Sequence, residues 1–284
     1  MVLVTRKSNS NPSFRSAKIY SDSAHFLYEL IQNADDNKYE DPTPSMRISL
    51  DESRAIRTLR IECNEIGFSR ANVEAICSLS ESSKRQPGQE RKHIGEKGMG
   101  FKSVFAVADV VTIQSGYYSF RFVNHESEPL AMIVPHWVEP LESEPFIGTS
   151  ITLQLTPKFS SANLIKKLKS MDPAFLMFLK NLKRLDIDLI QKQNSQTWAW
   201  RRSDFSRVAH GLSNVTVYSG QESTEYAMYS KNIPNLPHDD RRIGTTEAEL
   251  KLVFPVHQSS RNRKDKVALV HAFLPIRDYG FKVR

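Results

Sequence analysis

The spacing of apolar residues near the N-terminus limits the fold more than any other feature of this sequence. The segment HFLYELIQNADD carries its apolar residues at helical spacing, which predicts an amphipathic helix. Those residues are Phe26, Leu27, Leu30, Ile31 and Ala34. Two segments typical of strands follow at 46–50 and 56–63, and more strand-like segments continue to residue 155. This order predicts an α+β fold in which helices cover one face of a mixed, mainly antiparallel sheet.

Changes of pattern along the chain predict its domain organisation. Residues 1–20 are polar, and we expect them to be a flexible N-terminal segment. Residues 21–158 contain the first helix and its strands and are expected to form the first domain. Residues 159–185 predict a helical connector divided near Pro173. Residues 186–284 carry a second set of strand-like segments, which we interpret as an incomplete second α+β domain.

A glycine-rich segment, IGEKGMGFKSVF, is the first candidate for a binding function. Three of the eleven glycines in the chain fall here, at Gly95, Gly98 and Gly100, together with Lys97 and Lys102. Glycine lets backbone N–H groups approach a ligand, and the start of a following helix favours an anion. The order is not that of a Walker A motif, because Phe101 separates Gly100 from Lys102. Either a phosphate site or a tight surface turn fits this composition.

The polar side of the first predicted helix is the second candidate. Glu29, Asn33 and Asp36 are spaced so that they share one stripe opposite the apolar face. An ordinary solvated face would account for such a stripe. Asparagine, however, competes for backbone hydrogen bonds inside a helix, so its presence suggests a function. An amide oxygen can bind Mg²⁺, and a glutamate one turn earlier can polarise a water molecule.

Four motifs occur in order along the chain: ELIQNADD, NEIGF, GEKGMGFKSVF and GTSITLQL. Together they resemble the ATP-binding domain of the GHKL superfamily, which includes gyrase, the heat-shock chaperone ATPases, histidine kinases and MutL. The sequence is most similar to the chaperone-like branch found in sacsin and the NO VEIN proteins. The resemblance covers residues 20–156 and implies a Bergerat-type ATP-binding sandwich, with ATP and Mg²⁺ as cofactors.

The resemblance also implies roles for individual residues. Glu29 corresponds to the glutamate that orients and deprotonates the attacking water, and Asn33 corresponds to the Mg²⁺ ligand. Lys84 lies at the start of a segment that resembles an ATP lid, residues 84–94. The other residues expected to contact the nucleotide are Asp36, Asn64, Glu65, Gly67, Phe68, Gly95, Lys97, Gly98, Met99, Gly100, Phe101, Lys102 and Thr149.

The sequence departs from the superfamily pattern at the turn expected beside the adenine. The usual DxGxG order has an aspartate where this chain has Cys63, and its first glycine is replaced by Glu65. A thiol is a weak acceptor, so Cys63 is better explained as a small buried strand residue. Adenine recognition would then depend on Asn64, Glu65, a backbone carbonyl or a water molecule. The preference between ATP and GTP is therefore open.

Composition limits the cellular compartments and the kinds of binding partner to be expected. The 39 basic and 32 acidic side chains give a net charge of +7, which attracts phosphates in nucleotides or nucleic acid alike. Two cysteines exclude a disulfide framework, and no apolar segment is long enough to span a membrane. We therefore expect a cytoplasmic or nuclear protein with no membrane partner. The basic segment RNRKDK is a weak signal for nucleic acid, because no aromatic residues are interleaved with it.

These features lead to one functional hypothesis with two alternatives. The first is a Mg²⁺–ATP-binding module with slow ATPase activity, whose lid closure drives conformational or dimerisation changes in a chaperone-like protein. The hypothesis is compatible with a homodimer, and it leaves both the oligomeric state and the client protein open. One alternative is a nucleotide-binding switch that does not hydrolyse ATP. The other is a nucleic-acid-associated protein.

Overall fold

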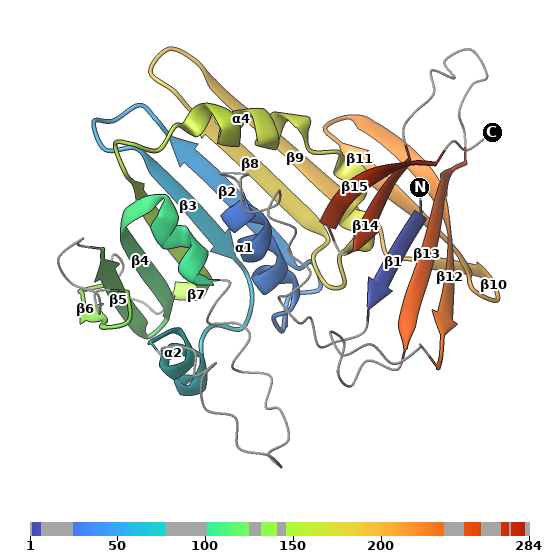
Figure 1. Cartoon of the computed structure of the whole chain (residues 1–284), viewed down its shortest axis with the longest axis horizontal. Coiled ribbons are helices and arrows are strands. Elements are labelled where there is room, and N and C mark those ends of the chain that lie inside the picture. The colour runs from blue at the N-terminus through green and yellow to red at the C-terminus, as the bar shows by residue number, and fades with distance from the viewer. Residues whose placement is uncertain are drawn as a thin grey trace. The chain divides into compact units, whose positions relative to one another are not determined.

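The computed structural model describes residues 2–6, 25–77, 101–124, 132–140, 146–235, 247–256, 268–272 and 274–281. They form an α+β fold with extensive mixed sheet and few helices, as the sequence predicted (Figure 1). The chain divides into two compact units. The first unit comprises residues 22–170 and 184–198, and the second comprises residues 1–21, 171–183 and 199–284.

The sheet of the first unit has the strand order β9-β8-β2-β3-β7-β4-β5-β6. The pairs β2–β3, β3–β7, β7–β4, β4–β5 and β5–β6 are antiparallel, and the pair β2–β8 is parallel. The strands are β2 (Ser45–Asp51), β3 (Thr58–Cys63), β4 (Ala108–Gly116), β5 (Tyr118–Val123), β6 (His136–Trp137), β7 (Phe146–Leu155), β8 (Arg184–Ile190) and the first half of β9 (Ser195–Arg202).

The central strands alternate in burial, which fixes the face of the sheet that carries the core. On β2 the side chains of Met46, Ile48 and Leu50 are buried. Intervening residues lie on the opposite face, where the hydroxyl of Ser49 donates a hydrogen bond to Asp188 on β8 at 3.0 Å. A period of two, apolar on one face and polar on the other, is what a sheet covered on one side requires.

Helices cover the apolar face of this sheet. α1 (His25–Asp35), η2 (Lys102–Ala106) and α4 (Ser161–Ser170) lie on this face, and α2 (Arg70–Cys77) lies near one end of the sheet (Figure 1). In α1, Leu27 and Ile31 are fully buried, which agrees with the predicted apolar face. Tyr28 of α1 lies against Lys167 of α4, whose Nζ is 4.9 Å from the ring centroid, so these two helices are neighbours in the helical layer (Figure 1).

Within its described residues, the second unit contains a sheet and one short helix. Its strand order is β15-β14-β1-β13-β12-β11-β9, and β10 pairs with β11. The helix η3 (Pro173–Phe178) buries Met177 and Phe178 in a core with Val215, Val217 and Val253. The strands are β1 (Val2–Arg6), β10 (Ser206–Ala209), β11 (Leu212–Ser219), β12 (Glu222–Ile233), β13 (Ala248–Pro255), β14 (Ala268–Ala272) and β15 (Leu274–Phe281).

Two expectations about domain organisation differ from this structure. Residues 2–6, expected to be flexible, form β1, which pairs with β13 and β14. The boundaries expected at 158 and 185 also differ, because β8 pairs in parallel with β2 and therefore belongs to the first unit. Both differences come from pairing between distant segments, which local composition does not report.

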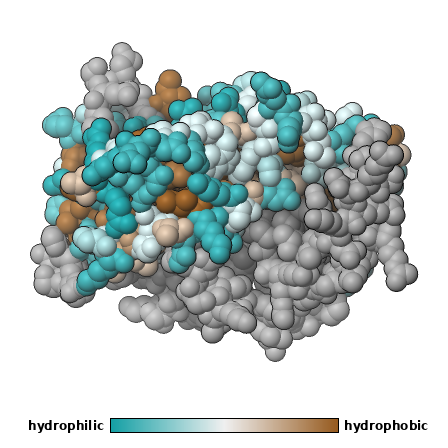
Figure 2. Space-filling view, turned by 90° about the horizontal axis from the view of Figure 1, so that it is seen from above, coloured by the Kyte–Doolittle hydropathy of each residue, from teal (hydrophilic) through white to brown (hydrophobic). Residues whose placement is uncertain are grey.

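The described part of the face seen in Figure 2 is mainly polar. In Figure 2 hydrophilic and intermediate residues predominate on the coloured part of the face that is visible, and hydrophobic residues occur in small groups. None of the helices within the described ranges has the length and apolar character needed to cross a membrane.

Candidate functional site

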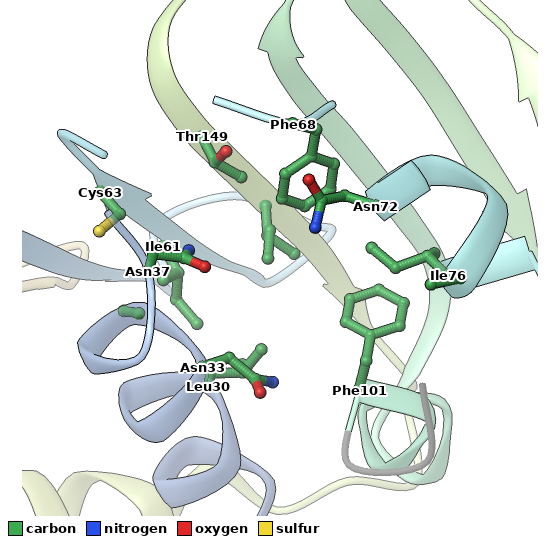
Figure 3. A pocket seen from close by; sticks show the side chains of 13 residues that line it. Leu30, Asn33, Asn37, Ile61, Cys63, Phe68, Asn72, Ile76, Phe101 and Thr149 are labelled. Carbon is green, nitrogen blue, oxygen red and sulfur yellow. The ribbon is translucent and has the colours of Figure 1, made fainter. Parts of the chain in front are cut away.

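A pocket of about 230 Å³ lies in the first unit, between α1, α2 and the ends of β3 and β7 (Figure 3). Most of its wall is apolar, and its polar groups are uncharged amide, hydroxyl and thiol side chains. The residues that line it are Leu30, Asn33, Ala34, Asn37, Ile61, Cys63, Phe68, Asn72, Ala75, Ile76, Phe101, Thr149 and Ile151. Apolar walls with a few polar groups are typical of sites for small organic ligands.

The end of the pocket at β3 and β7 is held by close backbone packing. Cys63 and Thr149 are direct partners in the antiparallel pair of these strands. Next to Thr149, Gly148 has φ +94°, and a Cβ at this position would be 2.0 Å from the carbonyl oxygen of Cys63. Glycine is therefore required at position 148 for the two strands to approach as they do.

A buried polar network stands behind this end of the pocket. The Thr149 hydroxyl donates a hydrogen bond to Oε1 of Glu65, and the backbone N–H of Gly67 donates to Oε2 at 2.9 Å. Ser115 Oγ lies 2.6 Å from Thr149 Oγ1 and accepts a hydrogen bond from the N–H of Phe68 at 2.7 Å. Glu65 is only 4% exposed, so these partners are what make its burial tolerable.

Cys63 is held by Tyr39, a residue that the sequence interpretation did not include. The Tyr39 hydroxyl donates to the carbonyl oxygen of Ala34 at 2.6 Å and lies 2.9 Å from the sulfur of Cys63. Burial raises the pKa of the Cys63 thiol to about 12, and the negative charge of Glu65 acts in the same direction. Burial also raises the pKa of Tyr39. Cys63 is therefore a protonated thiol in the wall of the pocket at neutral pH.

Four residues expected from the sequence to contact nucleotide line the same pocket: Asn33, Phe68, Phe101 and Thr149. They come from α1, the turn after β3, the start of η2 and β7, so the fold brings together segments that are far apart in the chain. Figure 3 shows the side chains of Asn33 and Phe101 on opposite walls of the pocket. Glu29 lies on α1 one turn before Asn33 and is half-buried, while Asp36 directly follows α1 and is exposed.

Other predicted residues have structural partners away from the pocket. The Asn64 amide accepts from the N–H of Ser45 at 2.7 Å and donates to the carbonyl of Thr43 at 3.1 Å. Lys102 donates to the carbonyl oxygens of Ile76, at 2.6 Å, and Met132, at 2.5 Å. In this structure Lys102 therefore ties the end of α2 to η2, and its burial lowers its pKa.

Several predicted residues lie outside the described residues: Lys84, Gly95, Lys97, Gly98, Met99 and Gly100. The same is true of the expected lid, 84–94. Phe101, the residue that follows Gly100 in the sequence, does line the pocket. The glycine cluster expected to hold the phosphates is thus outside the described residues, whereas Asn33, the expected Mg²⁺ ligand, lies within them and lines the pocket.

Sequence reasoning missed two amides that line the pocket, Asn37 and Asn72. Asn37 follows Asn33 by four residues, and that helical spacing was an available signal. No such signal was available for Asn72, because an asparagine at the start of a helix is explained by its local hydrogen bonds. Its Oδ1 accepts from the N–H and the hydroxyl of Ser69 at 2.9 and 2.6 Å.

Comparison with known proteins adds independent information. No family model matches the chain. The chain is 29% identical to Protein NO VEIN of Arabidopsis thaliana over 294 residues, which covers 94% of this chain and 10% of that protein. It is 32% identical to the chaperone protein HtpG of Burkholderia lata over 161 residues, which covers 48% of this chain and 25% of HtpG. The chain thus spans only a small part of each relative, and both similarities fit the relationship suggested by the four motifs.

Proposed function

We propose that this chain is a Mg²⁺–ATP-binding module of the GHKL type with slow ATPase activity. The observation that carries the proposal is the pocket, whose wall combines Asn33, Phe68, Phe101 and Thr149, four residues that the motif resemblance assigns to contact with nucleotide. The similarity to HtpG, a protein named as a chaperone, supports the same class. The nucleotide-driven conformational or dimerisation change expected from the resemblance remains a prediction.

The residues of the pocket suit an adenine nucleotide. Ile61, Ile76 and Phe101 provide apolar surface for a flat ring, and the amides of Asn37 and Asn72 can hydrogen-bond its edge. On this proposal the apolar walls orient the base and exclude water from it. The phosphates would lie near Asn33, and the motif resemblance assigns their binding to the glycine cluster that precedes Phe101 in the sequence.

The donor set also fits Mg²⁺. The described residues include no group of three or more His, Cys, Asp or Glu side chains able to hold a metal ion. A Mg²⁺ ion that travels with a nucleotide does not need such a cage, because phosphates and water supply most of its ligands and one protein oxygen suffices. Asn33 would supply that oxygen, and the bound ion would neutralise phosphate charge. Glu29, one helical turn earlier, would take the proton of the attacking water.

Calorimetric titration with ATP and ADP, with and without Mg²⁺, tests binding. We expect ATP to bind the wild-type chain in a Mg²⁺-dependent way and Asn33→Ala to abolish that dependence. Asn214→Ala is the matched control, because Asn214 lies on β11 in the second unit and donates to Glu225 at 3.1 Å. The absence of any binding of either nucleotide to the wild type would refute the proposal.

Phosphate release tests turnover separately. In Glu29→Gln we expect nucleotide affinity to stay within about twofold and phosphate release to fall by about 10²-fold or more, as is typical for loss of a general base. Glu74→Gln, on the exposed side of α2, is the control. If the wild type binds ATP and releases no phosphate, the ATPase part of the proposal fails and the switch without hydrolysis is the better description.

A further inference from the structure

The hydrogen-bond network behind the pocket determines whether the Thr149 hydroxyl can donate a hydrogen bond to a ligand or only accept one. The hydroxyl has one hydrogen, and Oε1 of Glu65 accepts it. Ser115 donates to the carbonyl oxygen of Gly148 at 3.1 Å and its Oγ lies 2.6 Å from Thr149 Oγ1, so its one hydrogen is shared between these two acceptors. Thr149 lines the pocket, so it faces a ligand only as an acceptor.

The thiol of Cys63, like the hydroxyl of Thr149, has no hydrogen available to donate to a ligand. The hydrogen of the Tyr39 hydroxyl is donated to the carbonyl of Ala34, so the contact between Tyr39 and the Cys63 sulfur uses the thiol hydrogen. Cys63 and Thr149 are direct partners on β3 and β7, which puts their Cβ atoms about 4.5–5.5 Å apart. Two side chains that can only accept therefore sit together at one end of the pocket.

We propose that Glu65 is a positioning residue that acts through Thr149 and selects purine nucleotides with a donor at position 6 over those with an acceptor there. The inference rests on the proposed function, since it specifies which base the nucleotide pocket takes. A 6-amino group can donate to Thr149, whereas a 6-oxo group would face two acceptors with no hydrogen between them. Leaving such groups unpaired in a buried site is what produces discrimination.

The variant Glu65→Gln offers a specific test because the backbone N–H of Gly67 is a fixed donor, and this sets which way the new amide must point. The N–H of Gly67 is a fixed backbone donor 2.9 Å from Oε2, so the amide oxygen of Glu65→Gln must face it. The amide nitrogen then faces Thr149 and donates to it. This releases the hydrogen of Thr149, which becomes free to turn to Ser115 or to a 6-oxo group of a ligand.

The experiment compares the binding of ATP and ITP to the whole 284-residue chain. ITP is the matched probe because it carries an oxygen at position 6 and no 2-amino group. We expect the wild type to bind ATP at least about tenfold more tightly than ITP, the size of effect that one hydrogen bond gives. In Glu65→Gln the ratio should fall to within about threefold.

Glu52→Gln is the matched control. Glu52 also lies in the first unit and accepts from a hydroxyl, that of Ser161, and from Gln191 Nε2 at 3.0 Å, but it does not line the pocket. This variant should keep the wild-type ratio. A loss of stability alone would weaken both nucleotides equally and leave the ratio unchanged, so a lowered ratio in Glu65→Gln identifies the positioning role.

The other outcomes decide between the two proposals. If ATP and ITP bind the wild type equally, or if Glu65→Gln keeps the full preference, the role of Glu65 is wrong while the nucleotide pocket stands. If neither nucleotide binds the wild type, the proposed function fails, and the inference fails with it. Should Glu65→Gln not fold, Thr149→Val replaces it: this variant removes the acceptor and should also bring the ratio to within about threefold.

Discussion

Both units bury polar side chains, but they satisfy them in different ways. In the second unit Arg202 is 6% exposed, and its guanidinium donates to the carbonyls of Leu176, Lys180 and Ser203 and lies over the ring of Phe205. In the first unit Thr149 is equally buried, yet it also lines a pocket. The same requirement for partners thus produces a structural anchor in one unit and part of a pocket wall in the other.

The comparison predicts that backbone packing at the pocket is the most sensitive point of the molecule. Gly148→Ala should destabilise the first unit by about 4 kcal/mol, because it combines a positive φ with a clash against the carbonyl of Cys63. Gly220→Ala is the control in the second unit: φ there is +61°, but a Cβ meets nothing within 4 Å, so the cost should be about 1 kcal/mol. Urea unfolding measures both, and equal costs would contradict the role assigned to Gly148.

The second prediction concerns the anchor itself. Arg202→Ala should destabilise the second unit by about 3 kcal/mol, because three carbonyl oxygens lose a donor. Arg207→Ala, an exposed position on β10, should change stability by less than about 0.5 kcal/mol. The fluorescence of Trp200, which packs against Phe175 in the same unit, reports the transition. A small effect of Arg202→Ala would remove the distinction drawn between the two units.

The smallest predicted effect is a pH dependence of the first unit. The pKa of Cys63 is raised from 9.0 to about 12, so its contribution to stability is complete below pH 9 and is lost as pH rises toward 12. The Cys63→Ala variant should lose less stability than the wild type over this range, by about 1 kcal/mol per pH unit at most. Cys77→Ala is the comparison: burial also raises the pKa of this less buried thiol, so its removal should change the slope less than removal of Cys63. Identical slopes for wild type and Cys63→Ala would show that the thiol is not buried as described.

Local patterns in the sequence were sufficient to predict the helical layer and the central strands. The apolar spacing predicted α1, and the segments expected at 46–50 and 56–63 correspond closely to β2 and β3. These elements could be predicted because the apolar pattern of each one is contained in a short stretch of consecutive residues.

Long-range pairing and hydrogen-bond direction could not be predicted in this way. Residues 2–6 find their partners at 248–252, and β8 pairs with β2 across more than a hundred residues. The association of Tyr39 with Cys63, and of Glu65 with Thr149, depends on the same long-range geometry. The motif resemblance suggested that positions 64 and 65 contact a base, and in the structure Asn64 hydrogen-bonds the loop before β2.

The close approach of Gly148 to Cys63 has an evolutionary consequence. The glycine fixes where the backbone of residue 63 lies, and it does so without reference to the side chain that residue 63 carries. The backbone position of residue 63 and the identity of its side chain can therefore change independently in evolution. A lineage can exchange a thiol for a hydroxyl or a carboxylate by one substitution, and so change the chemistry of the pocket wall, while the strand pair that presents the group stays as it is.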